Sequence, residues 1–122
     1  MSGAARPRAD RGSGTVLALG LICVLVVLTF AVVGLARAVH ARGTAQTAAD
    51  LGALAAAQAL HDPAGARGEP CALAAGVVRA NGAEPAGCRV AGAVVDVSAR
   101  VTVLGQVDGV LVARASARAG PA

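Results

Sequence analysis

The sequence predicts an α+β protein. A single N-terminal transmembrane helix continues as a long helix, and a small domain with one helix and a β-hairpin follows it. Three patterns lead to this fold class. Residues 15–36 carry no charge, residues 37–60 are rich in alanine without proline, and residues 95–103 alternate apolar with polar side chains. These patterns are typical of a membrane span, a helix and a half-buried strand, respectively.

The uncharged segment TVLALGLICVLVVLTFAVVGLA, residues 15–36, has the length of a membrane span. A helix rises about 1.5 Å per residue, so this segment covers roughly 33 Å, enough to cross the hydrocarbon core. A chain of 122 residues could not bury such a helix on every side. We therefore predict a single-pass membrane protein with a basic N-terminal segment, residues 1–14.

A secretory signal peptide is the alternative interpretation of this segment. The apolar run is longer than the core of a usual signal, which has about 7–15 residues. The small-x-small site near its end, Ala36-Arg37-Ala38, carries an arginine in the middle. Cleavage there would release a small secreted protein, and the sequence favours the membrane anchor over it.

The orientation of the span follows from charge and from the cysteines. Three arginines precede the span and two follow closely, which favours a cytoplasmic N-terminus. Cys71 and Cys88 lie beyond the span, and a disulfide between them would persist only outside the cytoplasm. We therefore expect a cell-membrane protein with an extracytoplasmic C-terminal part. The arginines concerned are Arg6, Arg8 and Arg11 before the span, and Arg37 and Arg42 after it.

Residues 37–60 are expected to form an extracytoplasmic extension of the same helix. Small side chains recur there every three or four residues, at Ala41, Ala45, Ala49, Gly52 and Ala56. We call these five residues the small-residue stripe. Such a stripe lets another helix approach closely. High helix propensity explains the same composition, so on the residues alone both interpretations stay open.

Residues 61–122 predict a small α+β domain. A turn-rich break at residues 61–70 precedes a short helix from Pro70 to about Ala80. The alternating strand 95–103 then leads through a turn around Asp108-Gly109 into a second strand, which gives a hairpin with one apolar face. A lone hairpin is marginal in water, so a helix must cover this face. A Cys71–Cys88 disulfide would add roughly 3 kcal/mol in the chain-entropy model.

Several classes of function are not supported by the composition. The net charge is +4, but the arginines are dispersed and the chain has neither Trp nor Tyr to stack on bases, so we expect no nucleic-acid binding. His40, His61 and the cysteines do not have the spacing of a zinc site. No nucleophile elbow, paired carboxylate site or phosphate loop is present. We therefore expect no catalytic residues, no metal and no cofactor.

Two stretches carry a family resemblance. RGSGT at residues 11–15, before the span, and AQTAADLGALAAA at residues 45–57 resemble the N-terminal segment of TadE/TadG-like proteins of the Flp (Tad) pilus-assembly system. Cys71, Cys88 and the ending ARAGP at residues 117–121 look like those of short actinobacterial TadE-like proteins from secretion-type gene neighbourhoods. The N-terminal likeness covers about half of the chain, and its motifs are the more specific.

The resemblance implies a pilin-like fold and a minor pilin or pseudopilin with its N-terminus in the cytoplasm. Its partners would be the membrane and other pilin-like or secretion-apparatus subunits. Prepilin peptidase is a further candidate partner, with the Gly12–Ser13 bond as the processing site. Ala45, Ala49, Gly52 and Ala56 would pack against neighbouring subunits. One position departs from the family pattern, because Leu17 stands where pilin-like chains typically carry glutamate. The sequence is therefore also compatible with an assembly factor that stays unprocessed.

A membrane-anchored binding module is the second functional hypothesis. In that protein the hairpin would recognise a ligand through arginines on its polar face. These are Arg100, Arg114 and Arg118. The two hypotheses differ in where function lies, because the first depends on the long helix and the second on the strands.

Overall fold

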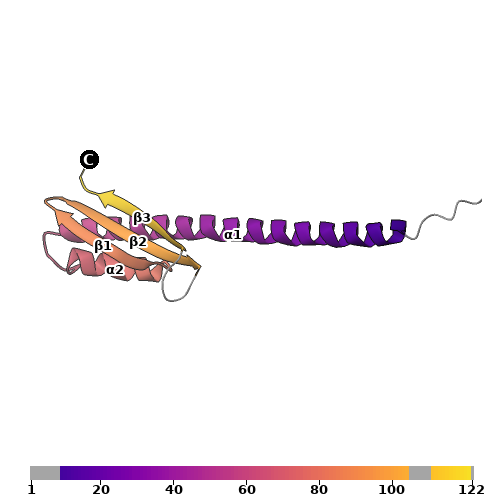
Figure 1. The fold of residues 1–122 in the computed structure, drawn as a ribbon. Helices are drawn as coiled ribbons and strands as arrows, with labels where there is room; N and C mark the ends of the chain where they lie inside the picture. Colours follow the sequence, from indigo (N-terminus) through magenta and orange to yellow (C-terminus); the bar gives the residue numbers. More distant parts are fainter. Residues whose placement is uncertain (1–8, 105–110, 122) are drawn as a thin grey trace, which may run out of the picture. The chain divides into compact units, whose positions relative to one another are not determined.

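A computed structural model describes residues 9–104 and 111–121 and confirms the α+β fold class (Figure 1). A long helix and a short helix precede a three-stranded antiparallel sheet. The elements are α1 (Ala9–Leu60), α2 (Pro70–Ala80), β1 (Glu84–Ala91), β2 (Val94–Leu104) and β3 (Leu111–Ala119). The turn expected around Asp108-Gly109 lies outside the described residues.

Helix α1 contains both the apolar segment and the alanine-rich segment without interruption. Its most apolar 18-residue window has a mean hydropathy of 3.1 and is not buried at all. The helix is thus long and apolar enough to cross a membrane, which suggests single-pass anchoring. The chain divides into two compact units between Ala36 and Arg37, so the alanine-rich part of α1 belongs to the same unit as α2 and the sheet.

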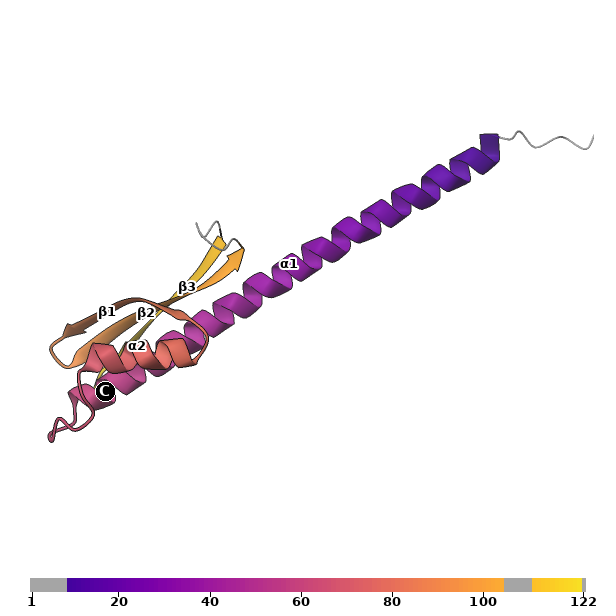
Figure 2. The ribbon, with the colours of Figure 1, turned by 90° about the horizontal axis from the view of Figure 1, so that it is seen from below.

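The predicted hairpin is present, and the structure adds a third strand to it. Strands β2 and β3 pair antiparallel, with Val97 opposite Ala117 and Ala99 opposite Ala115. Strand β1 pairs with the other side of β2, so β2 is the central strand (Figure 2). The sequence of β1 hides its conformation, because Pro85 and Gly87 interrupt any alternation and flank an irregularity in the pairing.

Helix α2 forms where the sequence predicts it. Pro70 occupies the first turn, where a missing N–H costs nothing. The Glu69 carboxylate accepts hydrogen bonds from the backbone N–H groups of Cys71, at 3.0 Å, and Ala72, at 2.7 Å. The helix ends at Ala80 with Asn81 as its C-cap, and Gly82 follows with a φ of 77°, which glycine adopts without strain.

The core is built from alanine and valine. Alanines of α1 and α2 meet the inward side chains of the sheet, and the largest fully buried side chains are Val78, Val95 and Val97. No buried polar side chain occurs among the described residues. Because alanine projects so little from a helix, the sheet and α2 can lie close to the α1 backbone.

Candidate functional site

The small-residue stripe lies beneath the chain's own domain. Ala45, Ala49 and Ala56 are completely buried, and Ala41 is 6% exposed. Ala45, Ala49 and Ala56 belong to one core cluster with α2 and the sheet. The surface is therefore a packing surface, but its partner differs from the one expected from the resemblance. The domain of the same chain covers these residues, so they are not free to contact a neighbouring subunit.

Gly52 lies where α2 and β2 approach α1 closely. A Cβ atom at this position would lie 2.9 Å from Cγ2 of Val78, 3.3 Å from the backbone O of Ala74 and 3.3 Å from Cγ1 of Val97. Contacts of this length to a backbone oxygen cannot relax by rotating a side chain. The absence of a side chain at residue 52 is therefore what lets α2 and β2 pack on α1.

The opposite side of this part of α1 carries two exposed leucines. Leu51 is 41% and Leu54 is 52% exposed, and they lie three residues apart on adjacent turns. On the same exposed side, Nε2 of Gln46 donates a hydrogen bond of 2.9 Å to Oδ1 of Asp50. Two large apolar side chains in a run of alanines are the sequence signal for this surface. We call Leu51 and Leu54 the leucine pair.

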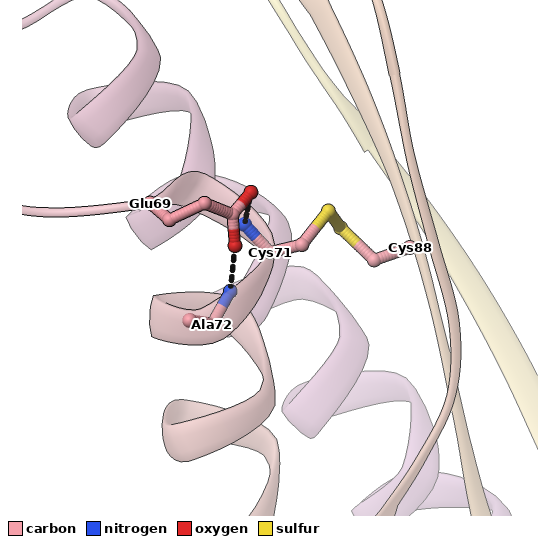
Figure 3. Close-up of a disulfide and its surroundings, with 4 residues drawn as sticks. All are labelled: Glu69, Cys71, Ala72 and Cys88. Atoms are coloured by element: carbon pink, nitrogen blue, oxygen red, sulfur yellow. Dashed lines mark hydrogen bonds between the residues drawn. A yellow bond between two sulfur atoms is a disulfide. The ribbon is translucent and has the colours of Figure 1, made fainter.

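The disulfide joins Cys71 at the start of α2 to Cys88 in β1, as predicted (Figure 3). The Cα atoms are 5.7 Å apart, a typical separation for a bridged pair. The bond lies next to the Glu69 cap and to an open cleft of about 290 Å³ between α2 and β1. The side chains lining this cleft are apolar apart from the two sulfurs.

The Gly12–Ser13 bond lies inside α1, which begins at Ala9. Both residues are exposed. Leu17, where the resemblance to pilin-like chains implies a glutamate, is 76% exposed and has no carboxylate. The assignment of this bond as the processing site remains a prediction.

The three arginines of the binding-module hypothesis lie on the solvent-facing side of the sheet, and two of them have carboxylate partners from the same chain. Nε of Arg100 donates to Oε2 of Glu84 at 3.0 Å. Nε of Arg118 donates to Oδ1 of Asp96 at 2.7 Å, and a second bond joins Nη2 to Oδ2 at 3.2 Å. Arg114 makes no ion pair with any described residue.

The Arg118 pair predicts a pH-dependent contribution to stability. The hydrogen bond from Arg118 lowers the pKa of Asp96, so the pair stabilises the fold above the carboxyl's ordinary pKa of about 3.9. That contribution is lost as the pH falls through the lower folded-state value. We expect the difference in thermal unfolding midpoint between the wild type and Asp96→Asn to be smaller at about pH 2.5 than at about pH 5, because the carboxyl becomes protonated between these values. A difference that grows on acidification would contradict the assignment.

The sequence of α1 matches a known family model. Residues 12–59 match a family model described as "Putative Flp pilus-assembly TadE/G-like". The chain therefore carries a TadE/G-like segment. No curated protein and no solved structure matches the chain.

The TadE/G-like match confirms the N-terminal resemblance and follows α1 closely. It starts at Gly12, runs through the apolar segment, and ends at Ala59, one residue before α1 ends. It therefore includes both the small-residue stripe and the leucine pair. It stops before α2, the disulfide and the sheet, so the likeness of the C-terminal part to short actinobacterial proteins stays a prediction.

Proposed function

We propose that this protein is a minor pilin or pseudopilin-type structural component of a Flp/Tad pilus or a related secretion apparatus, acting by helix packing. The TadE/G-like match supports a component associated with the Tad pilus. The observation that carries the packing mechanism is the exposed leucine pair on the side of α1 that the domain leaves uncovered.

The packing surface assigned by this proposal differs from the small-residue stripe. The stripe is occupied by the chain's own core, so a neighbouring subunit reaches α1 only from the exposed side. Leu51 and Leu54 are about half exposed, so burying the rest of each against an apolar helix contributes roughly 1–1.5 kcal/mol per leucine. That contribution is modest per contact and accumulates when subunits also pack along the apolar segment.

The proposal places the N-terminus in the cytoplasm and the C-terminal domain outside. The disulfide supports this orientation, because such bonds persist in oxidising compartments. Residues 1–14 would form the cytoplasmic segment, 15–36 the span, 37–60 the helix extension and 61–122 the small domain. Prepilin peptidase would cut the Gly12–Ser13 bond if the chain is processed. If this bond stays uncut, α1 with Leu17 is compatible with an assembly factor that remains in the membrane.

The double variant Leu51→Glu/Leu54→Glu tests the packing mechanism. A photo-crosslinking residue at Thr47, which is exposed one turn before Leu51, is expected to form adducts with a subunit that carries its own apolar N-terminal helix. The double variant should reduce the adduct yield about tenfold or more, because two apolar contacts are replaced by charges. The partner is identified by mass spectrometry of the adduct in membranes of the producing cell.

The matched control places the same photo-crosslinking residue at Thr102, which is exposed on the sheet. Helix packing predicts little adduct there, and no effect of the leucine substitutions on it. Equal yields from residues 47 and 102, or a yield at residue 47 that survives both glutamates, would rule out the leucine pair as the contact surface.

A further inference from the structure

The two edges of the sheet differ in how they are protected against pairing with another strand. At one edge, β1 contains Pro85 and an irregular pairing before Gly87, and Cys88 ties it to α2. Proline, irregularities and covering elements are common ways in which proteins block an edge. At the other edge, β3 (LVARASARA) has no proline, and its pairing with β2 is regular from Val112 to Ala119.

In the described parts of the chain, β3 pairs with another strand on one of its two sides only. Within the described parts of the chain, the backbone of β3 bonds to β2 alone, and β3 is the last strand in the sheet order. Figure 1 shows β3 at the border of the sheet, with β1 and β2 on its other side. An open edge of this kind is a template for strand addition.

Charged side chains form two rows across the solvent-facing side of the sheet, and both rows end on β3 with an arginine. The pairing register places Glu84, Arg100 and Arg114 in one row, and Arg89, Asp96 and Arg118 in the other. Small residues fill the row between them, namely Gly87, Ser98 and Ser116. A fourth strand beside β3 would therefore meet Arg114 and Arg118 with a small residue between them.

Arg114 is the least compensated member of these rows. Its cross-strand neighbour is Arg100, whose guanidinium is bonded to Glu84 on the far side. Like charges directly opposite each other destabilise a sheet. An acidic residue on the other side of Arg114 would offset this repulsion, and a second one would extend the row that ends at Arg118.

A second copy of this chain does not fit the edge. Strand β3 (LVARASARA) contains no acidic residue, so pairing two β3 strands offers no carboxylate to Arg114 or Arg118. Parallel pairing of β3 with the β1 edge of a second copy is also unfavourable. If Arg114 lay beside Glu84, Arg118 would lie beside Arg89, and like charges would meet. Pro85 would also stand in the new ladder, where it has no N–H to donate.

We propose that the open edge of β3 takes up an extended segment of a different protein as a fourth strand. That segment carries acidic residues at the two positions opposite Arg114 and Arg118, and small or β-branched apolar residues at the alternate positions. Main-chain hydrogen bonds provide affinity, and the two arginines select the acidic pattern. This contact is separate from the leucine pair on α1, so the two can be tested independently.

A palindromic peptide, Val-Glu-Val-Ser-Val-Glu-Val with a fluorescent label, tests the proposal because it fits either strand direction. Its anisotropy is titrated with the full-length protein in detergent micelles. We expect saturable binding that Arg114→Glu weakens about fivefold, since one cross-strand attraction becomes a repulsion. Arg114→Glu places a carboxylate opposite Arg100, so the variant retains the fold.

The matched control is Arg89→Glu, because Arg89 lies in the other charged row at the opposite edge and also makes no ion pair with a described residue. Strand addition at β3 predicts binding within about twofold of the wild type for this variant. A second control peptide, Val-Glu-Pro-Pro-Pro-Glu-Val, keeps the charges, but its consecutive prolines remove N–H groups on both sides of the strand, so it should not bind. Equal loss in the two variants, equal binding of both peptides, or no saturable binding at millimolar protein would overturn the proposal.

Discussion

Replacing Gly52 by leucine is expected to unfold the domain of this protein while leaving the apolar segment of α1 intact. The first atom of any side chain at residue 52 meets Val78, the backbone of Ala74 and Val97 at 2.9–3.3 Å. Overpacking a core usually costs about 1–3 kcal/mol. We expect a value of about 3 kcal/mol or more, because a backbone oxygen is among the obstacles and the core has only small side chains.

Gly43→Leu is the matched control for this substitution. Gly43 also lies in α1, but nothing lies within 4 Å of a Cβ atom built there. Leucine has a higher helix propensity than glycine, so this variant should be more stable than the wild type by about 0.5–1 kcal/mol. Pulse proteolysis with trypsin across a urea series measures the stability of both variants. This method suits the chain because it has arginines throughout and no Trp or Tyr for fluorescence. If the urea midpoints of both variants shift in the same direction, the close approach assigned to Gly52 is wrong.

Loss of the disulfide is expected to destabilise the domain by roughly 3 kcal/mol. The bond closes a loop between residues 17 apart in sequence and joins α2 to β1 beside an open cleft. Single domains of this size bury a smaller fraction of their surface than larger domains do, so a covalent tie is a large share of their net stability. Either reductant or the pair Cys71→Ser/Cys88→Ser should lower the urea midpoint by a similar amount.

The third cysteine provides the control for this experiment. Cys23 is exposed within the apolar segment of α1 and forms no disulfide. Cys23→Ser should leave the urea midpoint of the domain unchanged and should keep its full sensitivity to reductant. A midpoint that does not respond to reductant in the wild type would show that the disulfide adds nothing to stability.

Much of the fold follows from local sequence patterns. The uncharged run, the Pro70 start of α2 and the alternation from Val95 to Val103 each specify an element through short-range physics. Strand β1 could not be found in this way. Pro85 and Gly87 weaken its local preference, and its conformation depends on pairing with β2 and on the tie at Cys88.

The partner of the small-residue stripe could not be inferred from sequence for a different reason. A helix that packs against its own domain and one that packs against another subunit need the same small side chains at the same spacing. Only the tertiary structure shows that Val78 and Val97 occupy the space above Gly52. The exposed leucines were visible in the sequence, but their role depends on which side of α1 the domain covers.

The central claim is that α1 has two opposite packing sides, one for its own domain and one for another subunit. The most direct measurement determines domain stability and the yield of the Thr47 crosslink for two variants in the same membranes. These are Gly52→Leu and Leu51→Glu/Leu54→Glu. The account predicts that the glutamate variant loses the crosslink at unchanged stability, whereas Gly52→Leu loses stability. A glutamate variant that unfolds the domain, or that keeps the crosslink, would contradict it.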